Sequence, residues 1–161
     1  MFNLFKKKEV PVEVPKPKYR IAHKIIELRV YADDGVVEKI INQGIKLDYL
    51  DPYDGMSASE IKELEERVYQ VSDDVNDYRL EEKDDKLNLY VKDYKDKEYF
   101  IADISSYKNV KYYLKNKDNY DIDIQVKYGG GKYKVYSGGS VITDFIPPYI
   151  YVCITMYNRG E

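Results

Sequence analysis

The sequence predicts an α+β protein built on a small, strongly curved β-sheet or barrel, with two or three short helices at its openings. The chain has 161 residues, of which 34% are charged and 43% hydrophobic, and this suits a globular domain with a real core. Tyrosine is abundant, with 19 residues against four phenylalanines, and its ring suits half-buried strands. Several segments alternate between apolar and polar residues, which is the period of a strand.

Charge divides the chain into a tail and a domain. Residues 1–24 carry seven Lys/Arg and two Glu, a net charge of +5, and three prolines there favour extended backbone. We therefore expect residues 1–20 to be a flexible basic tail and residues 21–161 to be a single domain. Residues 25–98 carry a net charge of −10 and residues 99–161 a net charge of +2, so strong non-specific binding of nucleic acid by the whole domain is not expected.

The first helix is expected between residues 33 and 44, directly after the first strand. Four Val and Ile residues recur there at helical spacing. Either Asp33 or Asp34 is expected to cap the start of this helix, and Gly44 is expected to end it.

Two further helices are expected. Ser57 followed by Glu60 is a capping-box pattern and predicts a short helix over residues 57–66. Residues 107–117 again show apolar residues at helical spacing. The segments that alternate or are rich in β-branched residues are the predicted strands: 24–32, 67–71, 77–82, 87–94, 98–104, 120–128, 132–138 and 147–157. This order of elements fits neither a Rossmann fold nor a helical bundle.

The run Gly129-Gly130-Gly131 separates two of these strands. A phosphate-binding loop needs spaced glycines, then Lys and Ser or Thr, between a strand and a helix. Here Lys132 is followed by Tyr133, and both flanking segments are strands. We therefore expect a bent or bulged strand at the glycines.

Few catalytic or metal-binding groups are present. The chain has one cysteine, Cys153, and one histidine, His23, so a Cys-His pair has only one possible form. Cys153 lies in an apolar alternating segment, where cysteine usually packs as a small hydrophobe. We expect no catalytic residue, no metal and no cofactor. No apolar run is long enough to span a membrane, and a cytoplasmic protein of bacterial or phage type is expected.

Tyrosines stand beside cations in three stretches, LRVY, KNVKYYLK and KYGGGKYK. Aromatic rings can stack on unpaired bases while cations hold the phosphates. The alternative is that the tyrosines pack on half-buried strands and the lysines face water.

Five stretches together resemble a known family. They are HKIIELRVYADDGVVEKIINQG, DPYDGMSASEIKELEERVYQV, KLNLYVKDYKDKEYFIADISSYKNVKYYL, DIQVKYGGGKYKVY and PPYIYVCITMY. In this order they resemble the strands, helices and glycine-rich junction of the HIRAN domain, in particular its small stand-alone forms in low-GC bacteria. The similarity covers residues 23–157. The family's Asn-Pro-Tyr-Asp-like turn is replaced by LEEKDDKLNLYV over residues 80–91.

The resemblance implies an OB-like barrel that contributes no catalysis and, in some members, binds single-stranded DNA at a free 3′ end. It places Arg29 and Tyr31 where the family carries an Arg-aromatic cluster, and we add Lys132, Tyr133 and Lys134 beside the glycines as further contacts.

Two functions follow from these observations. The first is a non-enzymatic module that recognises single-stranded DNA or DNA ends. The second is a protein-binding adaptor, of phage or prophage type, that has lost DNA binding. The acidic central region, the replaced turn and the basic N-terminal tail favour the adaptor, because acidic surfaces repel phosphate and attract basic partners.

Overall fold

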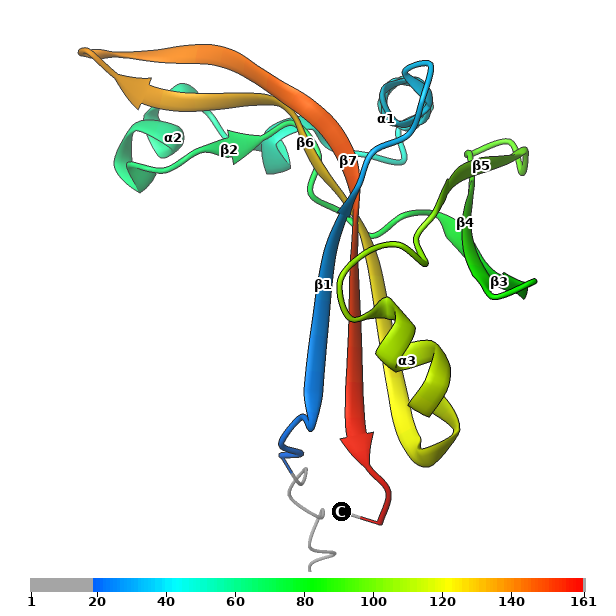
Figure 1. The fold of residues 1–161 in the computed structure, drawn as a ribbon. Coiled ribbons are helices and arrows are strands. Elements are labelled where there is room, and N and C mark those ends of the chain that lie inside the picture. Colours follow the sequence, from blue (N-terminus) through cyan, green and yellow to red (C-terminus); the bar gives the residue numbers. More distant parts are fainter. Residues whose placement is uncertain (1–18, 161) are drawn as a thin grey trace, which may run out of the picture.

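The computed structural model of the protein describes residues 19–160 (Figure 1). Most of the predicted basic tail therefore lies outside the described residues. The strands are β1 (Lys24–Val30), β2 (Val68–Tyr69), β3 (Asp77–Lys83), β4 (Lys86–Lys92), β5 (Glu98–Asp103), β6 (Tyr120–Ser137) and β7 (Ser140–Asn158). The helices are α1 (Val36–Lys46), α2 (Ala58–Leu64) and α3 (Val110–Asn116), with short 3-10 turns η1 (Pro52–Gly55) and η2 (Lys117–Asn119).

The strands form two antiparallel sheets. One has the order β1-β7-β6-β2, and the other has the order β3-β4-β5. The α+β class is confirmed, with three α-helices in the described part of the chain. Both sheets are open and residues 19–160 form no closed barrel, so the barrel stays a prediction.

The hairpin of β6 and β7 is the longest feature of the fold. Its two-residue tip, Gly138-Gly139, has φ values of 61° and 90°, which favour glycine. The sequence predicted two strands in residues 120–138, but β6 is continuous because its pairing with β7 runs through the glycines. The register shifts between Gly129 and Gly131, which confirms the predicted bulge.

At this bulge the hairpin bends, and its outer half leaves the body of the molecule (Figure 1). We call this outer half, residues 131–146, the arm. Gly130 and Gly131 have φ values of 65° and 79°, a left-handed backbone that only glycine adopts without strain. β2 pairs with the β6 side of the arm, and α2 lies beside it.

The core lies between the large sheet, the small sheet and the helices α1 and α3. One face of β1, β7 and β6 is apolar and buried, in register across the three strands. The buried residues of β1 and β7 on this face are Ile26, Leu28, Val30, Ile150, Val152, Ile154 and Met156. Strand alternation thus places every second residue in the core and the others on the opposite face.

The predicted ends of α1 are wrong. The residue before the helix is Gly35, which has a φ of 65° and makes no side-chain cap, so neither Asp33 nor Asp34 caps it. The helix also continues past Gly44 to Lys46. Gly44 is buried inside the helix because Leu50 and Tyr94 pack so closely on it that a Cβ would overlap them.

The boundaries of several other elements differ from the predicted ones. α2 begins behind Ser57 with both bonds of the predicted capping box present. β2 is only two residues long, although residues 67–71 were predicted as a strand. β7 begins at Ser140 rather than at residue 147, because its outer half pairs with β6 as far as the hairpin tip.

Candidate functional site

The face of β1 and β7 that points away from the core is open. Ile25, Glu27 and Arg29 of β1 are exposed, and Ile25 keeps 56% of its surface accessible. On β7 the residues of this face are Tyr149, Tyr151, Cys153 and Thr155, all half-buried. An antiparallel sheet with one buried and one open face is common.

Arg29, Tyr31 and Tyr149 form a cluster at the bend of the hairpin, here called the Arg29 cluster. The guanidinium carbon of Arg29 lies 5.1 Å from the centre of the Tyr149 ring, within cation–π range. The rings of Tyr31 and Tyr149 meet edge to face, with centres 5.7 Å apart and planes at 63°. Tyr31 is 51% exposed, so much of its ring is open to a ligand.

The glycines at the bend make room for this cluster. Tyr149 is paired with Gly129 in the β6–β7 register, and a Cβ on Gly129 would overlap the Tyr149 ring. The Tyr149 ring therefore packs against the β6 backbone, and the Arg29 guanidinium lies over it. Tyr107 lies between β5 and α3, and its hydroxyl donates to the Arg29 carbonyl at 3.1 Å, which fixes the end of β1 beside the ring.

Arg29 has no carboxylate within ion-pair distance among residues 19–160. Arg20, by contrast, lies 2.8 Å from Asp121, and Arg79 contacts two glutamates. The neighbouring carboxylate of Glu27 accepts a hydrogen bond of 2.6 Å from the Tyr151 hydroxyl, which raises the pKa of Tyr151. The guanidinium of Arg29 is thus held on an aromatic ring with its donors available to an anion.

The other three predicted contacts lie on the arm, across the bend from Arg29 and Tyr31. Lys132 is exposed. The ammonium of Lys134 lies 4.3 Å from the centre of the Tyr53 ring. Tyr133 is only 6% exposed, so its ring is a packing element with no open face for a base.

Tyr133 belongs to a second cluster that sequence reasoning missed. The guanidinium carbon of Arg67 lies 4.6 Å from the centre of its ring, and the Tyr69 ring is 5.5 Å away. The signal was present in the sequence, because Arg-Val-Tyr occurs at residues 29–31 and again at residues 67–69. In both copies the valine is buried. Because side chains alternate between the two faces of a strand, Arg and Tyr then lie on the same face, where they contact Tyr149 in the first copy and Tyr133 in the second.

His23 and Cys153 are not brought together as a catalytic pair. His23 Nε2 lies 3.1 Å from the hydroxyls of both Tyr112 and Tyr120, and its ring stacks on Tyr120. The Cys153 thiol is 3.9 Å from the Thr155 hydroxyl. Within residues 19–160 no three His, Cys, Asp or Glu side chains gather as metal ligands would.

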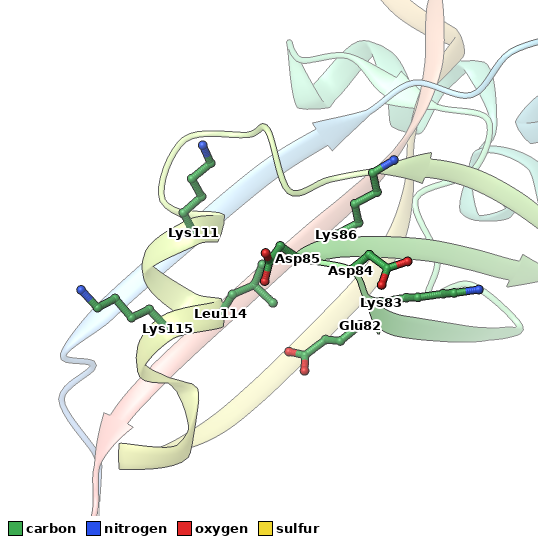
Figure 2. A pocket seen from close by; sticks show the side chains of 8 residues that line it. All are labelled: Glu82, Lys83, Asp84, Asp85, Lys86, Lys111, Leu114 and Lys115. Atoms are coloured by element: carbon green, nitrogen blue, oxygen red, sulfur yellow. The ribbon is translucent and has the colours of Figure 1, made fainter.

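A hollow of about 460 Å³ lies between the β3–β4 turn and α3 (Figure 2). Its lining is Glu82, Lys83, Asp84, Asp85, Lys86, Lys111, Leu114 and Lys115. Leu114 and Asp85 lie near its middle, whereas the four lysine side chains spread outward in different directions. The ammonium groups do not converge on one point, and three carboxylates accompany them. The hollow is therefore not arranged to bind a single phosphate.

The chain matches no protein-family model, no curated protein and no solved structure. No helix in residues 19–160 combines the length and apolar character needed to cross a membrane.

Proposed function

We propose that the protein is a non-enzymatic module that binds single-stranded DNA at the Arg29 cluster. The observation that carries this proposal is the guanidinium of Arg29, which forms no ion pair within residues 19–160 and lies on the Tyr149 ring, next to the half-exposed ring of Tyr31. Arginine donates to phosphate oxygens in a fixed fork, and an exposed tyrosine ring offers a stacking surface to any unpaired base.

Four further properties belong to the same proposal. Kinship with the HIRAN domain, its OB-like barrel and a preference for free 3′ ends are predictions from the resemblance. A cytoplasmic location, where single-stranded DNA arises in bacteria, is a prediction as well.

Fluorescence anisotropy with a labelled short single strand tests the proposal, at low and at physiological salt. We expect saturable binding that weakens as salt rises, because phosphate contacts release counterions. Tyr31→Ala is expected to cost about 1–3 kcal/mol of binding free energy, the usual contribution of one stacked base. Arg29→Ala is expected to weaken binding and to flatten the salt dependence.

Matched controls separate the site from general effects. Tyr19→Ala removes a tyrosine that is 96% exposed and has no part in the cluster. Lys95→Ala removes an exposed cation from the β4–β5 turn, on the other sheet. Both variants should bind like the wild type. Equal affinity of the Tyr31→Ala variant and the wild type, with the fold intact, would remove the site, and strands with free and blocked 3′ ends test the end preference.

A protein-binding adaptor is the second candidate, and one observation favours it. On the small sheet Phe100 is 54% exposed and its ring lies beside the ring of Tyr90. Arg79 lies over the Tyr90 ring and forms ion pairs with Glu81 and Glu98, so both carboxylates are close to the two rings. An exposed aromatic residue with acidic neighbours suits a basic protein partner, through the central region, more than it suits a nucleic acid. No DNA binding at low salt, where electrostatic attraction is strongest, would favour this candidate.

A further inference from the structure

The outer half of β7 has an open edge. Residues 140–146 pair with β6 on one side, whereas β1 pairs with β7 only from Ile150 to Met156. Among residues 19–160 no strand lies on the other side of the arm. β2 pairs with the arm on its β6 side, whereas α2 packs against both strands of the arm (Figure 1).

The register identifies which backbone groups point outward at this edge. The Lys132 carbonyl accepts a hydrogen bond of 2.8 Å from the Gln70 amide. Because the backbone N–H and C=O groups of successive residues point to alternate sides of a strand, the even-numbered residues of β6 in the arm direct these groups toward β2. Odd-numbered residues of β6 face β7, where they pair with even-numbered residues. The outward groups of β7 are therefore those of Val141, Thr143 and Phe145.

The side chains of this edge favour pairing with another strand. The segment SVITDFI is rich in β-branched residues, and Ile142 and Phe145 are 42% and 49% exposed. Between residues 137 and 149 the only charge is Asp144, and no lysine protects the edge. The Phe145 amide donates to the Asp144 carboxylate at 2.8 Å, a local bond that pairing would replace.

We propose that this edge pairs antiparallel with the same edge of a second copy of the chain, across a two-fold axis at Thr143. Thr143 then exchanges two N–H···O=C bonds with the partner's Thr143. Phe145 lies opposite the partner's Val141, an aromatic and β-branched pair of the kind that stabilises sheets. The two sheets join into one through the arms.

Self-complementarity is the reason to choose a second copy as the occupant. In this register Asp144 lies opposite the partner's Ile142, so the only charge on the strand never faces itself. A two-fold axis at Val141 would instead pair Thr143 with the partner's Gly139 and leave Phe145 without an opposite strand residue. The inference rests on the arm alone and does not depend on the proposed binding of DNA.

Sedimentation velocity of the full-length protein over a wide range of concentration is the first test. We expect the average mass to rise from monomer to dimer. Thr143→Pro removes an outward N–H that β6 does not use, and it should abolish the dimer while circular dichroism shows the sheets retained. Thr143→Val keeps the N–H and the β-branched shape, and this control should dimerise like the wild type.

Disulfide trapping tests the register directly and does not depend on the proline variant folding. With Cys153→Ser removing the natural thiol, Thr143→Cys should give a covalent dimer on mild oxidation. Directly opposed hydrogen-bonded residues have Cα atoms about 5.5 Å apart, inside the range of about 4.4–6.8 Å that a disulfide spans. Lys132→Cys, on the other strand of the arm, is the matched control and should remain monomeric.

Each outcome decides the inference. A concentration-dependent dimer that Thr143→Pro abolishes, with cross-linking only through residue 143, supports it. A monomer at every concentration, a dimer that Thr143→Pro leaves unchanged, or equal cross-linking through residue 132 would overturn it. The anisotropy experiment on Tyr31 uses a different part of the molecule, so its failure would be distinguishable from failure of the dimer.

Discussion

The ring of Tyr149 lies against the backbone of Gly129, its partner in the β6–β7 register. This contact explains why glycines stand at the bend. A side chain at residue 129 would occupy the space of the ring, and the ring is also the surface on which Arg29 rests. The bend of the hairpin and the geometry of the candidate site therefore depend on the same contact.

Gly129→Ala is expected to lower the free energy of unfolding by about 1–3 kcal/mol, the usual cost of overpacking. Urea denaturation followed by circular dichroism measures it. In a Tyr149→Ala background the same substitution should cost much less, because the space of the ring is then free. An equal loss in the two backgrounds would contradict the proposed contact.

Asp93 joins α1 to the β4–β5 turn, and its side chain is 4% exposed. Its carboxylate accepts bonds from the Lys95 and Lys97 amides at 2.8 and 2.9 Å and from Gln43 at 3.2 Å. Burial raises the pKa of Asp93, but the hydrogen bonds from Lys95, Lys97 and Gln43 outweigh it, so the pKa lies below its ordinary value.

Because the pKa of Asp93 is lowered in the folded state, its contribution to stability is complete above the unfolded pKa of about 3.9. The contribution is lost as the pH falls through the folded pKa. Asp93→Asn should lower the free energy of unfolding at neutral pH by about 1.5–3 kcal/mol, the range for hydrogen bonds to a charged group. Urea denaturation at several acidic pH values should show a weaker pH dependence for this variant than for the wild type. Identical acid dependence would be evidence against the role of Asp93.

Tyr128 is 2% exposed, and its hydroxyl has no hydrogen-bond partner in the described part of the chain. Burial raises its pKa, so the group stays neutral. Tyr128→Phe should leave the free energy of unfolding unchanged or raise it by up to about 1 kcal/mol, because a buried unpaired hydroxyl is costly. Tyr107→Phe, which removes a bond to the Arg29 carbonyl, should instead cost about 0.5–1.5 kcal/mol. Thermal unfolding of both variants checks this, and equal losses would refute it.

Ser57 caps α2 by accepting from the Glu60 amide at 3.3 Å, while its own amide donates to the Glu60 carboxylate at 2.7 Å. Ser57→Ala should reduce stability by about 0.5–2 kcal/mol in chemical denaturation. Ser59→Ala, an exposed position inside the same helix, is the control and should have little effect. A loss for Ser59→Ala as large as that for Ser57→Ala would show that the cap is not the cause.

Local sequence signals predicted much of the fold. The capping box at Ser57 and the bulge at the glycines are both present, since each depends on interactions within a few residues. The C-terminal end of α1 was predicted wrongly because Tyr94, which packs on Gly44, lies fifty residues further along the chain. Glycine often marks the end of a helix, but Gly44 lies inside α1 and allows other side chains to pack closely against the helix.

The candidate site was predictable in part. Arg29 and Tyr31 lie together because alternation places residues two apart on one face of a strand. Tyr149 was missed, since nothing in the local pattern says which strand pairs with β1. The residues next to Tyr133 in the sequence do not indicate that it is buried. Its burial results from contacts with Arg67 and Tyr69.

The sequence by itself determined the α+β class, the positions of most strands, and the absence of a Cys-based framework, because these depend on composition and on periods of a few residues. The tertiary structure alone decided which tyrosines are open and, among residues 19–160, that Arg29 has no carboxylate beside it and that the outer edge of β7 is unpaired. These properties arise from contacts between residues more than a hundred positions apart, such as Arg29 with Tyr149. Strand pairing over such separations is set by the packing of the whole core rather than by local preference.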